Sequence, residues 1–222
     1  MTLDEIAYNL LNLVRGGRSS NDENISLDQI KFNIKHYRAM FIRRDYARNG
    51  HVSKTIEQDL GCLHLKQVDA SKCCDLPPTC TVYRTQHKLP NTVRFNFIGK
   101  PDGTGAIPRV EPYEVEYLEH DRFTKGQTKY YVIDEYIYVY NPKGLEAINV
   151  RGVFEDPEEV FYFNTCNDGP CYDPQSPYPL PADMVAQINQ GIMNGELRLL
   201  AGSFPDTEND KQQDKMPVQQ GQ

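Results

Sequence analysis

The sequence predicts an α+β protein with an N-terminal helical hairpin, an antiparallel β-rich middle, and a C-terminal helix followed by a flexible tail. Two stretches near the N-terminus combine a capping-box start with apolar residues at helical spacing. The middle holds short runs of alternating apolar and polar residues between Pro and Gly. The end is polar and almost free of large apolar side chains. The expected divisions are 1–61, 62–163, 164–202 and 203–222.

A first helix is expected from the capping-box spacing of Thr2 and Glu5. The apolar residues that follow at helical spacing are Ile6, Leu10, Leu13 and Val14. Gly16 and Gly17 predict its end. A short polar loop then leads to a second helix, and this short connection favours antiparallel pairing of the two.

The second helix, between Ser26 and Gly50, is the strongest feature of the sequence. Ser26 and Gln29 have the capping-box spacing, and Asn49-Gly50 is a helix stop. Its expected apolar face consists of Ile30, Ile34, Tyr37, Phe41 and Ile42. Its expected basic surface consists of Lys31, Lys35, Arg38, Arg43, Arg44 and Arg48. We expect these six side chains to contact a neighbouring subunit, an acidic partner or phosphate; a solvated basic face is the alternative.

A brief third helix is expected between residues 52 and 60, with Ser53 as its cap and Gly61 as its stop. The expected strands are 62–68, 79–85, 92–98, 112–118, 129–134, 136–140 and 147–154. Many short strands separated by turn signals predict a small antiparallel sandwich or barrel.

The C-terminal part begins with a short helix at Asp156, which has Pro in its first turn. A Pro-rich loop follows at 164–181. The last helix opens at Pro181 and is expected to extend as far as Leu200. Its apolar stripe consists of Met184, Val185, Ile188, Ile192 and Met193. The tail, 203–222, is expected to be disordered in isolation.

The formal net charge of −7 is unevenly distributed. Residues 1–60 hold nine Lys/Arg against eight Asp/Glu, a charge of +1, and the remainder holds fifteen against twenty-three, a charge of −8. The acidic character of residues 61–222 argues against a general nucleic-acid binder, and it would let DNA slide past without being bound. No apolar run reaches the roughly 18 residues of a membrane span, and the start does not resemble a signal peptide. We therefore expect a protein that is made and kept in a cytosol.

The sequence contains no strong catalytic or metal-binding motif. The six cysteines are Cys62, Cys73, Cys74, Cys80, Cys166 and Cys171. They contain no CxxC pair, so buried free thiols are expected rather than zinc ligands or disulfides. The five histidines include no metal pair at i, i+4. The glycine-rich stretch at 99–105 lacks the GK[ST] order of a phosphate loop and is expected to be a hairpin loop.

Three acids, Asp156, Glu158 and Glu159, lie in the first turn of the expected short helix. The helix dipole favours them there, so no catalytic role is required. We predict no catalytic residue, no metal and no cofactor. Two alternatives remain open: a small cytosolic enzyme with a Cys nucleophile and a distant His, and a DNA-binding module that uses the basic helix 30–48.

Several stretches resemble the ring proteins in the virions of crAss-like tailed bacteriophages. They are LDEIAYNLLNLVRGGRSSNDENIS at 3–26, YRAMFIRRD at 37–45, QDLGCLHL at 58–65, YRT…KLP at 83–90, NVRGVFEDPEEV at 149–160, SPYPLPADMVAQINQGIM at 176–193 and the DTEND of the tail. The resemblance spans most of the chain in the family's order, and its motifs are structural rather than catalytic.

The resemblance implies a head-to-tail connector, or adaptor, subunit of the virion that is assembled in the host cytoplasm. Such proteins form a homo-oligomeric ring, commonly twelve-fold, beneath the portal of the capsid. They extend the DNA channel without sequence-specific binding and offer a platform for neighbouring connector or tail proteins. They are not enzymes, need no cofactor and do not act at a membrane. An extended C-terminal segment docks on the portal in related adaptors.

Overall fold

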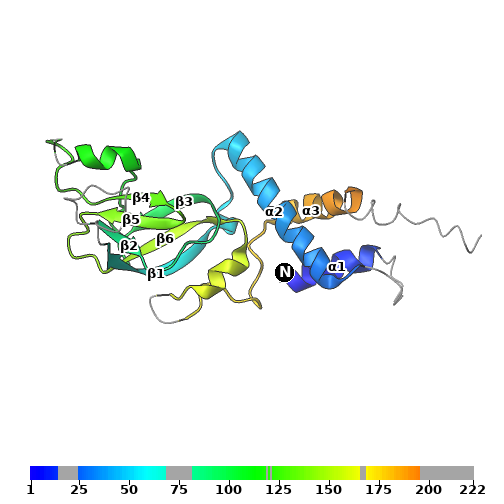
Figure 1. The fold of residues 1–222 in the computed structure, drawn as a ribbon. Helices are drawn as coiled ribbons and strands as arrows, with labels where there is room; N and C mark the ends of the chain where they lie inside the picture. Colours follow the sequence, from blue (N-terminus) through cyan, green and yellow to red (C-terminus); the bar gives the residue numbers. More distant parts are fainter. Residues whose placement is uncertain (15–24, 69–81, 119, 121, 166–168, 196–222) are drawn as a thin grey trace, which may run out of the picture.

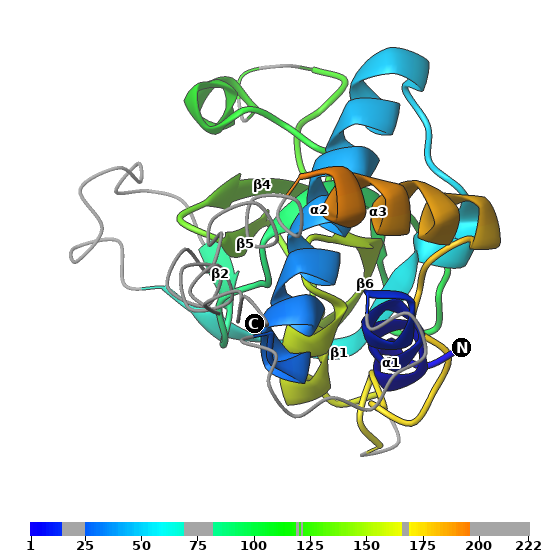
Figure 2. The same cartoon turned by 90° about the vertical axis from the view of Figure 1, so that its right-hand side faces the viewer.

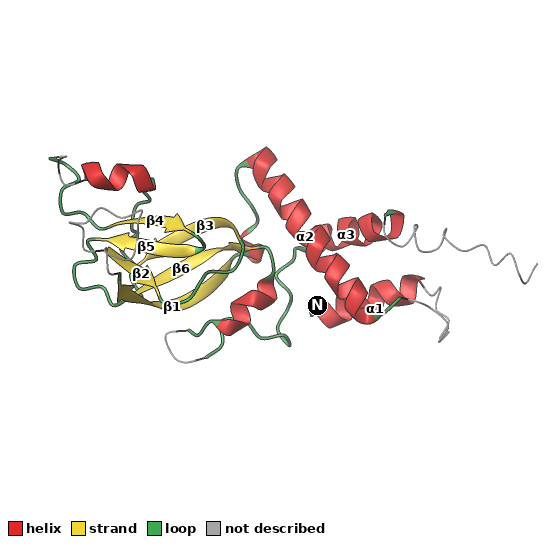
Figure 3. Ribbon diagram, in the orientation of Figure 1, coloured by secondary structure: helices red, strands yellow, loops and turns green. Residues whose placement is uncertain are grey.

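The computed structural model describes residues 1–14, 25–68, 82–118, 120, 122–165 and 169–195. It has two parts, with a group of helices at one end and a curled sheet at the other (Figure 1; Figure 3). The predicted α+β class, with helices at the start, a β-rich middle and a helix near the end, is confirmed. The predicted tail, 203–222, lies outside the described residues.

The helical part is a three-helix bundle of α1 (Leu3–Val14), α2 (Leu27–Asn49) and α3 (Ala182–Asn194). The long helix α2 packs against both of the others (Figure 2). Its core residues, each no more than 2% exposed, include Ile6, Leu10, Ile30, Ile34, Ile42, Ile188 and Ile192. A helix from near the end of the chain therefore completes the core that the two N-terminal helices begin.

The predicted starts of the first two helices and the predicted stop of the second are confirmed. At α1, Glu5 N donates to Thr2 Oγ1 (3.2 Å) and Thr2 N donates to Glu5 Oε2 (3.0 Å), which is a full capping box. At α2, Gln29 N donates to Ser26 Oγ (3.1 Å). The helix ends at Gly50, whose φ of 68° is in the left-handed region. The predicted stop of the first helix at Gly16 and Gly17 lies outside the described residues.

The six strands form one sheet in which every neighbouring pair is antiparallel, in the order β3-β6-β1-β2-β5-β4. The strands are β1 (Gln58–Gln67), β2 (Val82–Thr85), β3 (Thr92–Gly99), β4 (Lys129–Ile133), β5 (Tyr136–Tyr140) and β6 (Ala147–Phe154). Representative pairs in the register are Leu65 with Thr85 and Tyr131 with Tyr138. Most of the predicted strands therefore form.

The two edge strands are linked through residues 107–110. Ile107 N donates to Ile98 O of β3 (2.8 Å), and Tyr130 N of β4 donates to Pro108 O (3.1 Å). The sheet is therefore curled towards closure, and of the two predicted architectures the barrel-like one is observed. The 99–105 stretch turns the chain back at this point, with Lys100 N donating to Thr104 O (3.0 Å). This geometry agrees with the predicted hairpin loop.

Both faces of the β4–β5 pair are covered, because alternate residues point to opposite sides. Ile137 and Val139 face the interior of the curled sheet, together with residues of β1, β3 and β6. Tyr131 and Tyr138 face the other side, and their rings stack with centroids 5.2 Å apart. This outer cluster is covered by Val115. Much of the tyrosine content is thus explained by sheet packing.

The predicted helix over 52–60 is wrong for most of its length. Only a 3-10 turn forms, η1 (Lys54–Ile56), which Ser53 caps, and β1 begins at Gln58. Gly61 is not a helix stop but a residue of β1 with a φ of 64°. A Cβ there would lie 2.6 Å from the main-chain oxygen of Asn164. The pairing of β1 with β6 shifts register at this point, so Gly61 provides the bulge.

The predicted strand at 112–118 is also wrong. The segment forms a 3-10 helix, η3 (Pro112–Tyr117), because Glu111 and Glu114 make a capping box around Pro112. The alternation of Tyr113, Val115 and Tyr117 was compatible with a half-buried strand. In the structure only Val115 of these three is buried, and the two tyrosines are 71% and 67% exposed.

The remaining described elements agree with the predictions. A further 3-10 helix, η4 (Pro157–Tyr162), follows Asp156, whose side chain caps it. The helix α3 begins at Ala182, and its predicted extension to Leu200 lies outside the described residues. No helix in the described part of the chain is long and apolar enough to cross a membrane.

Candidate functional site

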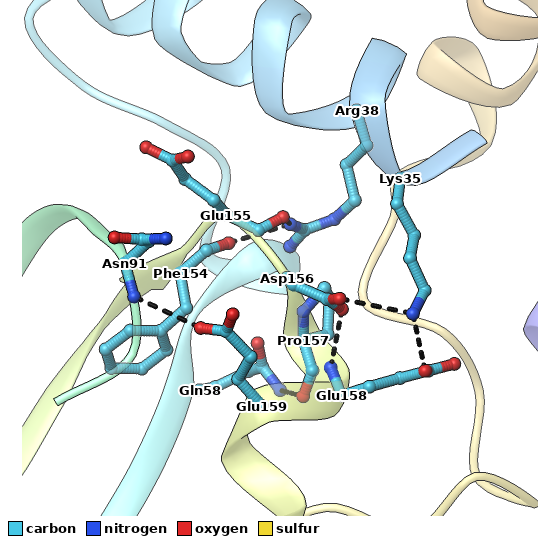
Figure 4. Close-up of polar contacts among 10 residues, drawn as sticks. All are labelled: Lys35, Arg38, Gln58, Asn91, Phe154, Glu155, Asp156, Pro157, Glu158 and Glu159. Atoms are coloured by element: carbon cyan, nitrogen blue, oxygen red, sulfur yellow. Dashed lines mark hydrogen bonds and ion pairs between the residues drawn. The ribbon is translucent and has the colours of Figure 1, made fainter. Parts of the chain in front are cut away.

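The clearest polar site lies where α2 meets the end of β6 and η4 (Figure 4). We call it the α2–β6 junction and define it by Lys35, Arg38, Glu155, Asp156 and Glu158. Two of the six basic residues that the sequence singled out belong to it. Its acids follow directly after β6, so the turn from strand to 3-10 helix presents them to α2.

Arg38 is the most deeply buried member, with 0% of its surface exposed. Its Nη1 donates to the main-chain oxygens of Phe154 (2.7 Å) and Glu155 (2.9 Å), and its Nε donates to Pro179 O (3.2 Å). Its guanidinium lies 5.6 Å from the ring centre of Tyr178. Burial lowers the pKa of Arg38 and raises that of the Tyr178 hydroxyl. Main-chain carbonyl oxygens, rather than a carboxylate, thus accept the hydrogen bonds of this buried cation.

Lys35 lies one helical turn earlier and binds two acids of the same chain. Its Nζ is 2.5 Å from Glu158 Oε2 and 3.1 Å from Asp156 Oδ2. Burial alone would lower the pKa of Lys35, but the hydrogen bonds to Glu158 and Asp156 outweigh it and raise that pKa. The other carboxylate oxygen of Asp156 accepts from Glu158 N (2.9 Å). Asp156 therefore caps η4 with one carboxylate oxygen and binds Lys35 of α2 with the other.

Two further basic side chains of α2 also have partners within the chain. Arg43 forms an ion pair with Glu155, and Lys31 pairs with Asp4 of α1 at 2.5 Å. Four of the six predicted interface residues therefore bind α2 to other elements of the same chain, namely α1, the end of β6 and η4. In the isolated chain, this leaves less free positive charge on α2 than the sequence suggested.

Arg44 and Arg48 are the two exceptions. Both are exposed, and no ion pair joins either of them to an acid in the described ranges. The guanidinium of Arg44 lies over the ring of Phe41, 4.5 Å from its centre. The role of all six residues between subunits stays a prediction. Of the six, Arg44 and Arg48 are the two that form no ion pair with another described residue and have no buried hydrogen bonds, so they are the best candidates for it.

The buried position of Arg38 was missed, although the spacing contained the signal. Ile30, Ile34, Arg38 and Ile42 follow each other at intervals of four, so Arg38 lies within the apolar stripe. Because arginine is basic, Arg38 was expected on the basic surface instead. The acceptors at 154, 155 and 179 are far away in sequence and are main-chain atoms, which carry no sequence signal.

The two cysteines among the described residues, Cys62 and Cys171, do not support a catalytic site. Cys62 is disulfide-bonded, so the expectation of free thiols is wrong for this residue. It lines a cavity with His64 and His87, but a sulfur in a disulfide is not available as a thiolate nucleophile. Cys171 is a free thiol whose pKa is raised to about 11 by burial and by the nearby Asp59. The cysteines outside the described residues are Cys73, Cys74, Cys80 and Cys166.

A metal site is not indicated by the described residues either, among which no group of three or more His, Cys, Asp or Glu side chains is arranged to hold an ion. The acids at 156, 158 and 159 each have a protein partner. Lys35 binds the first two, and Asn91 N donates to Glu159 Oε2 (3.2 Å). These partners give the acids a structural role.

The fold and the α2–β6 junction together define an α+β protein whose main polar cluster fixes a helical bundle to a curled sheet. No curated protein matches the chain. The chain belongs to the crAss-like phage ring family described as Phage tail ring protein 2, which matches residues 5–215. It is thus a structural component of the virion that assembles into a ring in the phage tail. The resemblance found in the sequence is confirmed.

Proposed function

We propose that this chain is a subunit of the head-to-tail connector, in a twelve-fold ring beneath the portal that extends the DNA channel and joins capsid to tail. The observation that carries the proposal is the family match over residues 5–215, which assigns the chain to a family of phage tail ring proteins. The connector position, the portal partner, the copy number and assembly in the host cytoplasm are the finer statements that we add.

The rigidity of the subunit supports this role. A ring subunit presents two different surfaces to its two neighbours, and their relative orientation sets the angle at which the ring closes. At the α2–β6 junction, Arg38 and Lys35 join the bundle to the sheet through buried or half-buried contacts. Such contacts leave little freedom for one part to turn against the other.

The charge distribution supports passage of DNA. Residues 61–222 carry a formal charge of −8, and much of the positive charge on α2 is paired within the chain. A surface of this sign repels phosphate, so DNA can move along it without being held. The same observation disfavours the DNA-binding module considered from the sequence.

Imaging the protein with its portal tests the proposal. We expect negative-stain images of the mixture to show rings seated coaxially on the portal, with an open central channel. Portal particles that look the same with and without the protein, together with a protein that stays monomeric, would contradict the connector assignment.

A further inference from the structure

The 3-10 helix η3 forms an exposed aromatic projection on the sheet end of the molecule. Val115 and Leu118 are buried against Tyr131 and Tyr138, which anchors the segment on the outer face of the sheet. Tyr113 and Tyr117 point away from this anchor and are 71% and 67% exposed. Exposed tyrosines on a fixed element are typical of protein–protein contact surfaces.

The C-terminal end of α2 has the complementary chemistry. Arg44 and Arg48 are exposed there beside Met40, which is 43% exposed. Residues 43–51 hold three Arg against one Asp, a formal charge of +2, although Arg43 is paired with Glu155 of the same chain. The segment 111–118, which contains η3, holds three acids and no base, a formal charge of −3. Guanidinium groups also pack well on tyrosine rings, so charge and aromatic character match together.

The two surfaces lie apart from each other in one subunit. In the view along the long axis of the molecule both project at the top, η3 towards the left and the end of α2 towards the right (Figure 2). A head-to-tail contact in a ring needs two unlike patches, which must not contact each other within one chain.

We infer that the aromatic projection of η3 in one copy docks on the exposed C-terminal end of α2 in the next copy of the ring. This inference rests on the proposed ring function and identifies its heterologous interface. The occupant of each surface is therefore a second copy of this chain, with Tyr113 and Tyr117 on one side and Arg44 and Arg48 on the other.

Site-specific photocross-linking tests the docking. The full chain with Tyr117→p-benzoylphenylalanine is mixed with ¹⁵N-labelled wild-type protein, assembled with the portal if the portal is required, and irradiated. Mass spectrometry of the digest should find unlabelled residue 117 joined to labelled residues 40–50. The same probe at Tyr162, which is 85% exposed on η4, is the matched control and should not give this product.

A charge-reversed chain provides the second measurement. In the ¹⁵N-labelled partner, Arg44→Glu with Arg48→Glu should lower the yield of the 117-to-α2 product by about tenfold or more, as expected for contact residues of an interface. Both positions are exposed, so the urea midpoint should fall only slightly, through loss of the Arg44 contact with Phe41 and of a favourable charge in the last turn of α2. An unchanged yield would count against the inference.

The outcomes separate this inference from the proposed function. Rings that form normally but whose cross-links from residue 117 reach another part of the neighbour, or the portal, would overturn the docking and leave the ring assignment intact. A protein that is monomeric with and without the portal would contradict the proposed function. The absence of any intermolecular product in that case would overturn the docking as well.

Discussion

Nη1 of Arg38 donates a 2.7 Å hydrogen bond to the main-chain oxygen of Phe154, which lies 116 positions further along the chain. Arg38 is in the middle of α2 and Phe154 ends β6, so this contact joins the bundle to the sheet. Burying a guanidinium is costly unless its donors are hydrogen-bonded, and here three main-chain oxygens accept from Nε and Nη1, while Nη2 has no hydrogen-bond partner among the described residues. The orientation of the two parts of the subunit depends on this residue.

Replacing Arg38 by Met should destabilise the fold. The variant keeps apolar volume but leaves the oxygens of Phe154, Glu155 and Pro179 without their donor, and each buried carbonyl that loses its partner is costly. We expect the free energy of unfolding to fall by about 2–4 kcal/mol, measured by urea denaturation. Arg48→Met, on the exposed end of the same helix, is the control and should change it by no more than about 0.5 kcal/mol. Equal effects of the two substitutions would refute the role given to Arg38.

The stabilisation provided by Lys35 should be lost at high pH. Its pKa is raised in the folded state above the ordinary value of 10.5, so the contribution is complete below that value and disappears as the pH rises through the folded-state pKa. We expect Lys35→Met to be less stable than wild type by about 1 kcal/mol at pH 7. The difference should shrink above pH 10.5 in urea titrations. A difference that stays constant up to pH 11.5 or so would argue against the ion pairs with Asp156 and Glu158.

Local signals in the sequence predicted the helix ends well, because caps depend on residues three or four positions apart. Ser26 and Gly50 are examples. The errors came where one pattern had two physical explanations. The alternation at 113, 115 and 117 suited a strand, but the capping box of Glu111 and Glu114 formed a 3-10 helix.

Long-range contacts were not accessible from the sequence. The pairing of Arg43 with Glu155 and of Lys35 with Asp156 depends on β6 reaching α2, which only the complete topology determines. The disulfide at Cys62 was missed because the expected compartment disfavoured it. Of the predicted basic surface, the structure therefore leaves Arg44 and Arg48 as the exposed part without ion pairs among the described residues.

The thiol of Cys171 should react slowly with alkylating agents. Only the thiolate is nucleophilic, and a pKa of about 11 against an ordinary value of 9.0 leaves roughly 100-fold less thiolate near neutral pH. Peptide mapping after brief iodoacetamide treatment at pH 7.5 should therefore show little modification at this position. The urea-unfolded protein is the control and should be modified quickly. Fast labelling of the folded chain would favour a thiol enzyme instead.

Removing residues 203–222 should weaken docking on the adjacent ring or portal while the remaining domain still folds. A polar segment of this composition can order on a partner and bury surface there. Surface plasmon resonance against immobilised portal should show a Kd raised by about tenfold or more, with an unchanged circular dichroism spectrum. Identical affinity of the full and shortened chains would show that the tail is not a docking arm.

The mass of the assembled particle tests the central claim most directly. Native mass spectrometry of the purified 25.5 kDa chain, alone and with its portal, measures the number of copies. We predict a closed ring of twelve copies, with a mass of about 306 kDa (twelve times 25.5 kDa), either alone or once the portal is present. A species of 25.5 kDa in both conditions would contradict the ring assignment.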